Sequence, residues 1–512
     1  MKKKNELQQF NTITELLQKS SEKYSENTLF VQMGKPDKER IDYARWGKDL
    51  LAMAGRFQKL EGKHIGIVCD LTYDCILCMY AVMLAGKVVV PLAADLSAEV
   101  LEKYVEKVDI DLLLYNENRV EGTVKNCRML LIPETYYLPG EPLQEWPEWE
   151  ENRTAGIFLT SGTEGEPRGV VLSQKNMAIV NSYRSVHIYE RNPRILIFLP
   201  THHIYSFTTL TTCISECDEM YLSRSIKYVA QEMEEIRPDA LTTVQMVNEL
   251  FQSRINKGID ESGKRKQLER LIAFSNGLRR LGIDLRNPIF KKLRDGLGGI
   301  PQLIITGGSA VPEETVQFFD DIGIIVIQAY GLTEASGFVS ANTIETNRKG
   351  TVGQANKFSR VRIVEGEIQV QGDNVMQGYY KQPEETARVL EDGWLKTGDL
   401  GYLDKDGYLH ITGRKKNLII LNNGENVSPE ELENELLKSI YICEVVVCEQ
   451  KGHIHAQVYA NQALEIEEEN LRSKIGDCIK ELNSINPVYK RIATWELRKE
   501  PFEKTGTMKI RR

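Results

Sequence analysis

Residues 158–171, FLTSGTEGEPRGVV, hold the side chains with the clearest potential for chemistry. They follow an apolar run and place hydroxyl side chains among three glycines. Such a loop exposes backbone N–H groups and hydroxyl donors without obstruction, which suits phosphate oxygens. The spacing to a Lys-Ser/Thr pair that defines a Walker A loop is missing, and no dinucleotide fingerprint is present. By itself the segment indicates either a surface turn or a phosphate-binding loop.

Six further motifs follow in order along the chain: LPTHH at 199–203, GGSA at 307–310, QAYGLTE at 328–334, GWLKTGDLGY at 393–402, GRKKNLI at 413–419 and KTGTMKIRR at 504–512. With these motifs the chain, from about residue 11 to its end, resembles the adenylate-forming superfamily. Within that superfamily it is most similar to the AMP-forming long-chain acyl-CoA synthetases.

The resemblance implies a two-step reaction. A carboxylate attacks the α-phosphate of ATP to give an acyl adenylate and pyrophosphate, and the thiol of coenzyme A then displaces AMP to give a thioester. Because two anions must meet in the first step, catalysis should rest mainly on positioning and electrostatic stabilisation.

The resemblance also implies a nucleotide site with a role for each motif. Tyr330 would lie against adenine, and Asp399 would accept hydrogen bonds from the ribose hydroxyls, with Arg414 as a second ribose contact. Thr333 would donate to the α-phosphate, and Glu334 would hold Mg²⁺, a hard cation that prefers carboxylate and phosphate oxygens. The remaining nucleotide contacts would be Thr160, Ser161, Gly162, Thr163, Gly165, Arg168, Gly308, Ser309, Ala310 and Gly331.

Each of these residues also has a simpler interpretation when it is taken alone. Tyr330 could be a core aromatic residue, Asp399 a turn residue in TGDLG, and Arg414 a solvated charge in a linker. The ordered set of motifs favours the nucleotide site over these alternatives.

The C-terminal residues are assigned by the same resemblance. Lys509 would enter the site during adenylation and neutralise charge between the carboxylate and the α-phosphate, a task that suits a point charge on a long stem. Lys416 matches a hinge about which the small C-terminal domain rotates between the two half-reactions, with Gly398 and Gly413 beside it. Gly424 would lie near the incoming thiol.

His203 in LPTHHIYSF matches the position that borders the acyl pocket. The adjacent His202 and His203 do not indicate a metal, because neighbouring residues rarely ligate one ion together and the other histidines are dispersed. The size of the pocket should depend on residues around His203, at 242–250 and at 307–330.

Three positions depart from the family pattern. Glu164 stands where Thr or Ser is usual, and a carboxylate near pyrophosphate costs Coulomb energy unless it faces solvent or Mg²⁺. Arg168 replaces the usual Lys but keeps the charge and could bind phosphate as a fork. Met508 occupies a usual Gly position. Because Thr333, Glu334, Asp399 and Lys509 are all present, we expect an active enzyme.

The elements that position these residues alternate between short β-branched runs and helical patterns from about residue 64 to residue 330. This alternation is typical of βαβ units, whose ligands sit at the carboxyl ends of the strands. We therefore predict an α/β fold with a large N-terminal domain, residues 1–412. It contains two doubly wound α/β sub-domains and a small β-barrel at about 350–412. A small mobile α+β C-terminal domain follows at 413–512.

Composition sets the outer limits of the interpretation. The chain has 512 residues, enough for roughly three domain-sized pieces, and a net charge of −8. An acidic surface argues against a nucleic-acid partner. No apolar run is long enough to span a bilayer and no export signal is evident, so a cytoplasmic location is expected. The nine cysteines are expected to be reduced thiols, with Cys75 and Cys78 in a buried helix.

Three functions stay open on these grounds. The first is a ligase that joins coenzyme A to a fatty acid or related apolar carboxylic acid. The second has the same adenylation but loads the phosphopantetheine of an acyl carrier protein. The third is a degenerate homologue that binds nucleotide or acyl ligand without turnover, with Glu164 as its main support. The sequence leaves the oligomeric state open, monomer or homodimer.

Overall fold

The protein is described by a computed structural model. It covers residues 9–512 without 35–37, 118, 161–166, 182–191, 297–298, 300, 310, 422–424, 451, 465, 505–509 and 511–512. Within the described part, no helix is both long and apolar enough to cross a membrane.

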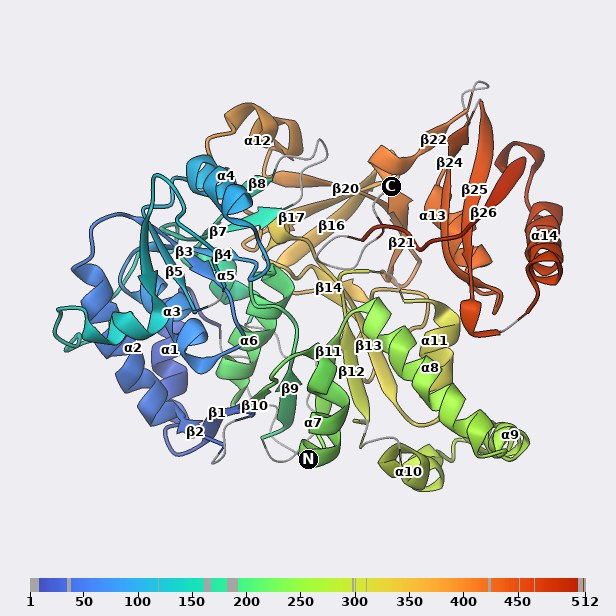
Figure 1. The fold of residues 1–512 in the computed structure, drawn as a ribbon, viewed down its shortest axis with the longest axis horizontal. Helices are drawn as coiled ribbons and strands as arrows, with labels where there is room; N and C mark the ends of the chain where they lie inside the picture. Colours follow the sequence, from blue (N-terminus) through green and yellow to red (C-terminus); the bar gives the residue numbers. More distant parts are fainter. Residues whose placement is uncertain are drawn as a thin grey trace.

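Two large, mainly parallel sheets form the N-terminal part of the molecule (Figure 1). The nine-stranded sheet has the order β15 (Gln354–Ala355), β14 (Ser340–Ala341), β13 (Ile325–Tyr330), β12 (Leu303–Thr306), β11 (Ala240–Thr243), β9 (Arg194–Ile197), β10 (Glu219–Leu222), β1 (Thr28–Gln32) and β2 (Arg40–Asp42). The seven-stranded sheet has the order β18 (Gly378–Tyr379), β8 (Arg168–Ser173), β7 (Thr154–Thr160), β4 (Val88–Leu92), β3 (His64–Val68), β5 (Leu112–Tyr115) and β6 (Arg128–Leu131).

Helices cover these sheets and fill the space between them. The largest apolar cluster joins strands of both sheets to buried residues of the first three helices and of α6. The helices are α1 (Ile13–Lys23), α2 (Tyr43–Gln58), α3 (Tyr73–Leu84), α4 (Ala98–Val108), α5 (Gln174–Ile179), α6 (Ile204–Glu216), α7 (Val229–Ile236), α8 (Gln245–Glu261), α9 (Arg265–Arg280), α10 (Arg286–Gly296) and α11 (Glu313–Asp321), with short 3₁₀ turns η1 (Ile132–Tyr137), η2 (Ile226–Tyr228) and η3 (Thr333–Ala335).

Local sequence explains where several of these helices begin and how deeply they lie. The side chains of Thr12, Asp42 and Thr72 each accept a hydrogen bond from the first turn of the helix that follows, which satisfies a free N–H group. Helix α3 is apolar on all sides and buried along its length, as expected for a core helix. Cys75 and Cys78 lie within it as free thiols, and burial raises the pKa of Cys78 to about 12.

A third sheet follows in the range predicted to form the small β-barrel. It is antiparallel and five-stranded, and its strands are β16 (Ser359–Val364), β17 (Glu367–Gly372), β19 (Leu390–Glu391), β20 (Trp394–Leu403) and β21 (Leu409–Arg414), with α12 (Pro383–Val389) beside it. This sheet carries Asp399 and Arg414 toward the two larger sheets.

The last part of the chain has a hydrophobic core of its own, made entirely of residues between 419 and 497. Figure 1 shows it at the upper right, beside the rest of the molecule. Its elements are η4 (Lys415–Asn417), β22 (Ile419–Ile420), β23 (Asn426–Val427), α13 (Pro429–Leu436), β24 (Ile442–Gln450), β25 (His453–Ala460), η5 (Gln462–Leu464), α14 (Glu468–Ile485), η6 (Val488–Lys490) and β26 (Thr494–Arg498).

The predicted fold class is confirmed: the fold is α/β, with a large N-terminal domain and a smaller C-terminal domain. The boundary between residues 412 and 413 stays a prediction. The sequence did not predict strands β1, β2, β10 and β26. Strands β2 and β26 are edge strands, and β1 and β10 follow β2 inward in the nine-stranded sheet.

Candidate active site

The predicted phosphate loop lies between two paired strands. Thr160 at the end of β7 stands opposite Arg168 at the start of β8, so the antiparallel pairing brings the two ends of the loop together. Ser161, Gly162, Thr163, Glu164 and Gly165 fall outside the described residues, as do Ala310, Gly424, Met508 and Lys509.

Arg168 takes part in a polar chain that leads to Glu334. Its Nη2 lies 2.8 Å from Glu385 Oε2, and its guanidinium carbon lies 5.3 Å from the centre of the Tyr379 ring. The Tyr379 hydroxyl donates to Glu334 Oε1 at 2.9 Å. Burial, together with the neighbouring Glu334 carboxylate, raises the pKa of Tyr379, so its hydroxyl stays protonated and remains a donor.

Glu334 is placed by a tight turn after β13. A Cβ on Gly331 would lie 2.1 Å from the Gly337 carbonyl oxygen, so this close approach of two chain segments requires glycine. Thr333 and Glu334 then form the 3₁₀ turn η3, and the Glu334 carbonyl accepts from the Met376 N–H at 2.9 Å. The turn and its neighbour fix the direction of the Glu334 backbone.

The buried Tyr330 and Asp399 meet the half-exposed side chain of Arg414 in one network. The Tyr330 hydroxyl donates to Asp399 Oδ2 at 2.7 Å, and Arg414 Nε lies 2.6 Å from Asp399 Oδ1. Asp399 and Arg414 stand opposite each other in the pairing of β20 with β21. Burial, followed by the Asp399 charge, raises the pKa of Tyr330 well above its usual value. These three residues, far apart in the sequence, were predicted to share a ribose and adenine site, and the fold brings them together.

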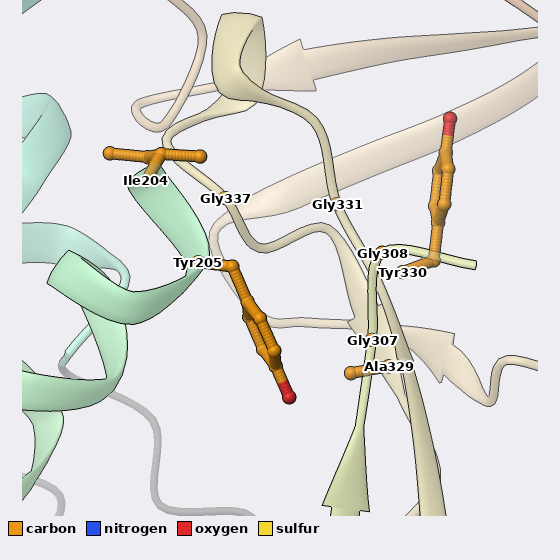
Figure 2. A pocket seen from close by; sticks show the side chains of 8 residues that line it. All are labelled: Ile204, Tyr205, Gly307, Gly308, Ala329, Tyr330, Gly331 and Gly337. Carbon is orange, nitrogen blue, oxygen red and sulfur yellow. The ribbon is translucent and has the colours of Figure 1, made fainter. Parts of the chain in front are cut away.

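A mainly apolar pocket lies next to Tyr330. Its cavity volume is about 40 Å³, and Figure 2 shows its lining residues: Ile204, Tyr205, Gly307, Gly308, Ala329, Tyr330, Gly331 and Gly337. The pocket therefore runs between the start of α6 and the ends of β12 and β13. Gly308 has a φ of +81°, and no atom lies within 4 Å of where its Cβ would be.

Tyr205 narrows this pocket from the α6 side. Its ring lies against Gly307, where a Cβ would come within 3.2 Å of the ring edge, and its hydroxyl donates to the Ile305 carbonyl at 3.3 Å. In Figure 2 the ring of Tyr205 projects from α6 toward Ala329, whereas Tyr330 lies on the far side of Gly308. Sequence reasoning indicated the surrounding segments but missed Tyr205 and Tyr379. In the sequence each of them is recognisable only as an aromatic residue, and aromatic residues are equally typical of a packed core.

The two adjacent histidines precede α6 beside the pocket. Their ring centres are 3.9 Å apart, and His203 takes the position before the first helical residue. Burial, reinforced by the neighbouring His203, lowers the pKa of His202 to about 3, so His202 is neutral near pH 7. His203 lies next to Ile204 in the chain but is not one of the residues that line the pocket.

The predicted hinge lies at a polar junction. Lys416 belongs to η4, and the preceding Lys415 pairs with Glu367 at 2.9 Å. The Ser428 hydroxyl donates to the Thr412 carbonyl at 2.8 Å, directly beside Gly413. The contacts on both sides of the junction are therefore hydrogen bonds and ion pairs.

The donor set fits a nucleotide with Mg²⁺. Among the described residues, no group of three or more His, Cys, Asp or Glu could hold a metal by itself. Glu334 uses Oε1 for Tyr379, which leaves Oε2 for a hard cation that takes its other ligands from phosphate and water. A cation that takes its other ligands from phosphate and water needs only one carboxylate from the protein.

Comparison with known proteins agrees with this geometry. Residues 17–380 match the family model of the AMP-binding enzyme, and residues 416–512 match that of the AMP-binding enzyme C-terminal domain. The long-chain-fatty-acid–CoA ligase FadD15 of Mycobacterium bovis is 30% identical over 310 residues, which are 57% of this chain and 52% of that protein. The chloroplastic long-chain-fatty-acid–[acyl-carrier-protein] ligase AEE15 of Arabidopsis thaliana is 29% identical over 365 residues, covering 58% and 50%. The chain thus spans about half the length of these curated relatives.

Solved structures show the same fold over nearly the whole chain. The o-succinylbenzoate CoA synthetase MenE of Bacillus subtilis, in complex with its acyl-adenylate intermediate, has a TM-score of 0.75 at 22% identity and covers 97% of this chain and 96% of its own. The same enzyme in complex with ATP and magnesium has a TM-score of 0.74 at 22% identity, covering 97% and 98%. Since the family model matches more than half of the residues, the chain belongs to the AMP-binding enzyme family of the adenylate-forming superfamily.

Proposed function

We propose that the protein activates a fatty acid with ATP and transfers the acyl group to coenzyme A. The observation that carries this proposal is the Tyr330–Asp399–Arg414 network beside a mainly apolar pocket. A polar site for a ribose and a pocket for an apolar group share Tyr330 as a common wall. That is the arrangement needed to bring an acid to the α-phosphate of ATP.

In the first step a carboxylate oxygen forms a bond to the α-phosphorus, and the bond to the β-phosphate oxygen breaks to release pyrophosphate. In the second step the thiol sulfur of coenzyme A bonds to the acyl carbon, AMP leaves, and the thiol proton passes to solvent. The domain rotation implied by the family would separate the two steps, with Lys416 as the hinge and Gly424 near the thiol.

The described residues would orient the nucleotide. Asp399 already accepts a hydrogen bond from Tyr330 and pairs with Arg414, so its position is fixed before the ribose hydroxyls arrive. Glu334, oriented by Tyr379, would hold Mg²⁺, which supplies positive charge to the phosphates when bound. Thr333 would donate to the α-phosphate, and Lys509 would neutralise the meeting anions. His203 would border the entrance to the acid.

The position of Arg168 in the motif suggests that it binds phosphate, but its guanidinium already has partners in the protein. Its guanidinium is engaged by Glu385 and lies near the Tyr379 ring. A phosphate that approached it would compete with the Glu385 carboxylate. The replacement of the usual Lys by Arg is compatible with binding both anions at once, because the guanidinium has five donors.

The apolar pocket would take the tail of the acid. Its cavity volume of about 40 Å³ is far below the range that ligand pockets occupy, so an acyl tail would enter only where a lining side chain moves aside. The ring of Tyr205 would block a longer acyl tail, because it fills the space between α6 and Gly307.

A carrier protein is the second candidate for the acceptor. One of the relatives at 29% identity is named as an acyl-carrier-protein ligase, whereas another at 30% identity is named as a CoA ligase. Both acceptors present a phosphopantetheine thiol, so the same adenylation site would serve either of them.

The deciding experiment offers purified protein ATP, Mg²⁺ and a panel of straight-chain and aromatic acids, with coenzyme A and separately with a holo carrier protein. Thioester product is measured for each pair, together with the exchange of pyrophosphate into ATP. We expect exchange and thioester with an apolar acid, and loss of exchange in Lys509→Ala. If no acid supported exchange in the wild type, or if Lys509→Ala exchanged normally, the proposal would be wrong.

The acid pocket has its own test. Tyr205→Ala should shift the preferred straight-chain acid toward a longer one, because the ring that limits the pocket is removed. Tyr205→Phe is the matched control, since it keeps the ring and removes only the hydroxyl that donates to Ile305. An unchanged chain-length profile in Tyr205→Ala would show that the acid tail binds elsewhere.

A further inference from the structure

Glu367 is a buried carboxylate next to the candidate ribose site. It begins β17, and its side chain is only 8% exposed. Its Oε1 accepts from the Gly398 N–H at 3.0 Å, and its Oε2 lies 2.9 Å from Lys415 Nζ. Gly398 directly precedes Asp399, and Lys415 directly follows Arg414. One carboxylate therefore contacts the chain neighbours of both residues that the proposed function assigns to the ribose.

The first of these contacts falls on a bulge in the pairing of β17 with β20. Residues 397–399 of β20 lie between two paired positions that only Ile368 separates on β17. Gly398, in the middle of the bulge, has a φ of +71°, a left-handed conformation that favours glycine. A bulge re-aims the side chains of its strand, and Asp399 is the last residue in this one. The direction of the Asp399 carboxylate therefore depends on the shape of the bulge.

Two side chains supply hydrogen bonds where the bulge interrupts the ladder between the strands. The Glu367 carboxylate accepts from the Gly398 N–H. The Thr397 hydroxyl accepts from the Asp399 N–H at 3.1 Å and donates to the Ile368 carbonyl at 2.7 Å. A buried backbone N–H group without a partner is costly, and a carboxylate is a stronger acceptor than a neutral oxygen. Glu367 therefore makes a main contribution to holding the bulge in one shape.

The second contact connects the bulge to the end of β21. Figure 1 shows β20 and β21 between the larger sheets and the C-terminal part. The Lys415 side chain is 56% exposed, yet it turns toward Glu367, and the preceding Arg414 pairs with Asp399 at 2.6 Å. Because Glu367 is already fixed by a backbone N–H group, its ion pair holds the backbone beside Arg414 close to the backbone beside Asp399.

We propose that Glu367 is a positioning residue of the nucleotide site, which aims Asp399 and Arg414 at the ribose hydroxyls. This inference rests on the proposed function, because it uses the ribose contacts proposed there. In this role Glu367 acts through Gly398 and Lys415, without touching the nucleotide. Groups that are ordered before binding give tighter binding than groups that have to be ordered by the ligand. Glu367 therefore sets how strongly the site distinguishes a nucleotide with ribose hydroxyls from one without them.

The test compares the binding of ATP with that of 2′,3′-dideoxy-ATP, which lacks both ribose hydroxyls. Dissociation constants are measured by calorimetry on the full chain with Mg²⁺ and without an acid, so that no adenylate forms. We expect the wild type to bind ATP at least about tenfold more tightly, since the lost hydrogen bonds involve a charged acceptor. In Glu367→Ala this ratio should fall to about 2, because Asp399 and Arg414 lose their fixed positions.

Two further variants separate the contacts of Glu367. In Glu367→Gln the amide oxygen can still accept from the Gly398 N–H, and only the ion pair with Lys415 is lost. This conservative variant should keep more than about half of the wild-type ratio. Gly398→Ala changes the bulge itself: no atom lies within 4 Å of the added Cβ, but the left-handed φ disfavours a side chain. It should lower the ratio as Glu367→Ala does, so the proposal stays testable if Glu367→Ala does not fold.

Glu232→Ala is the matched control for the loss of a buried carboxylate. The side chain of Glu232, in α7, is 0% exposed and pairs with Arg224 at 2.9 Å, as Glu367 pairs with Lys415. This variant should be less stable than the wild type, but it should keep the wild-type ratio for the two nucleotides. Thermal unfolding of each variant establishes that it is folded at the temperature of the binding measurement.

Three results would overturn the proposal. A wild-type ratio in folded Glu367→Ala would mean that Glu367 only stabilises the sheet. A ratio that falls as far in Glu232→Ala would mean that it follows general stability. Equal binding of both nucleotides by the wild type would remove the ribose contacts on which the inference rests. The adenylation proposal is judged separately, by pyrophosphate exchange with ATP, so either proposal can fail while the other holds.

Discussion

The two sides of the candidate site are held together in different ways. Around Asp399, two partners on separate strands hold a buried carboxylate, Tyr330 by a hydrogen bond of 2.7 Å and Arg414 by an ion pair of 2.6 Å. Between the C-terminal part and the rest, described contacts include a hydrogen bond from Ser428 and an ion pair of Lys438, and the C-terminal core draws all its residues from 419–497. The difference favours our proposal of a preorganised nucleotide site around Asp399, facing a part whose hydrophobic core is its own.

The largest expected effect of a single substitution is at Asp399, whose network forms one side of this comparison. In Asp399→Asn an amide group replaces one acceptor oxygen at a buried position, so either Tyr330 or the half-exposed Arg414 loses its partner. We expect catalytic efficiency for ATP in pyrophosphate exchange to fall about 100-fold, since a lost charge-assisted hydrogen bond is worth about 1.5–3 kcal/mol.

Tyr330→Phe is the graded control for this change, because it removes one hydroxyl donor and keeps the ring. It should cost about tenfold, which corresponds to the lower end of the about 1.5–3 kcal/mol that a hydrogen bond to a charged group contributes. Wild-type efficiency in Asp399→Asn would show that the network is structural only and that the nucleotide binds elsewhere.

The junction should respond to the addition of a single methyl group. A Cβ on Gly413 would lie 2.2 Å from Ser428 Oγ and 2.8 Å from Glu430 Oε2. Ser428 cannot move aside freely, because its hydroxyl donates to the Thr412 carbonyl at 2.8 Å. In Gly413→Ala we therefore expect trypsin to cut the adjacent Arg414-Lys415-Lys416 segment several-fold faster, measured by the appearance of the C-terminal fragment.

Gly277→Ala is the matched control for the junction variant. Its Cβ would meet no atom within 4 Å, so the same chemical change is made without a clash. Equal cleavage rates in the two variants would contradict the idea that Gly413 holds the junction closed.

Sequence alone predicted the fold class and most strands of the parallel sheets, because buried strands leave continuous β-branched runs such as residues 88–92. It also grouped Tyr330, Asp399 and Arg414 through ordered motifs, although they are up to 84 residues apart by number. The pairing of β20 with β21 explains physically why Asp399 and Arg414 meet, and that register is not readable from either segment alone.

Other features of the site depend on packing between distant segments and could not be predicted. Tyr379 reaches Glu334 only because β18 pairs with β8, a contact between residues more than 200 positions apart. Tyr205 limits the pocket only because Gly307 lies against its ring. In the sequence both residues are simply aromatic, and the partner that gives each of them a role lies elsewhere in the chain.

The stability of the N-terminal part should depend on pH through His202. Its pKa is lowered to about 3 by burial, whereas the unfolded residue takes up a proton below about pH 6.5. The unfolded state therefore binds more protons between these values, and the free energy of unfolding falls as the pH drops. The fall should approach about 1.4 kcal/mol per pH unit, or about 2 kcal/mol in total by pH 5.

Urea unfolding at a series of pH values, for the wild type and for His202→Gln, isolates this effect. Between pH 7 and pH 5, the free energy of unfolding of the variant should fall by about 2 kcal/mol less than that of the wild type. His453→Gln is the control, because His453 is exposed on β25 and should leave the pH dependence unchanged. An identical pH dependence in His202→Gln and the wild type would mean that His202 is not buried in solution.

The smallest effect is expected at the ion pair that joins the C-terminal part to α11. Lys438 Nζ lies 3.7 Å from Glu314 Oε1, both side chains are about half exposed, and Lys438 also pairs with Glu435 at 2.8 Å. Exposed pairs of this kind contribute about 0.2–1 kcal/mol, and Lys438 keeps a partner when Glu314 is removed. A double-mutant cycle of Glu314→Gln and Lys438→Gln, measured by urea unfolding, should give a coupling energy below about 0.5 kcal/mol. A coupling above about 1 kcal/mol would mean that this exposed pair holds the two parts together, and the contrast with the Asp399 network would fail.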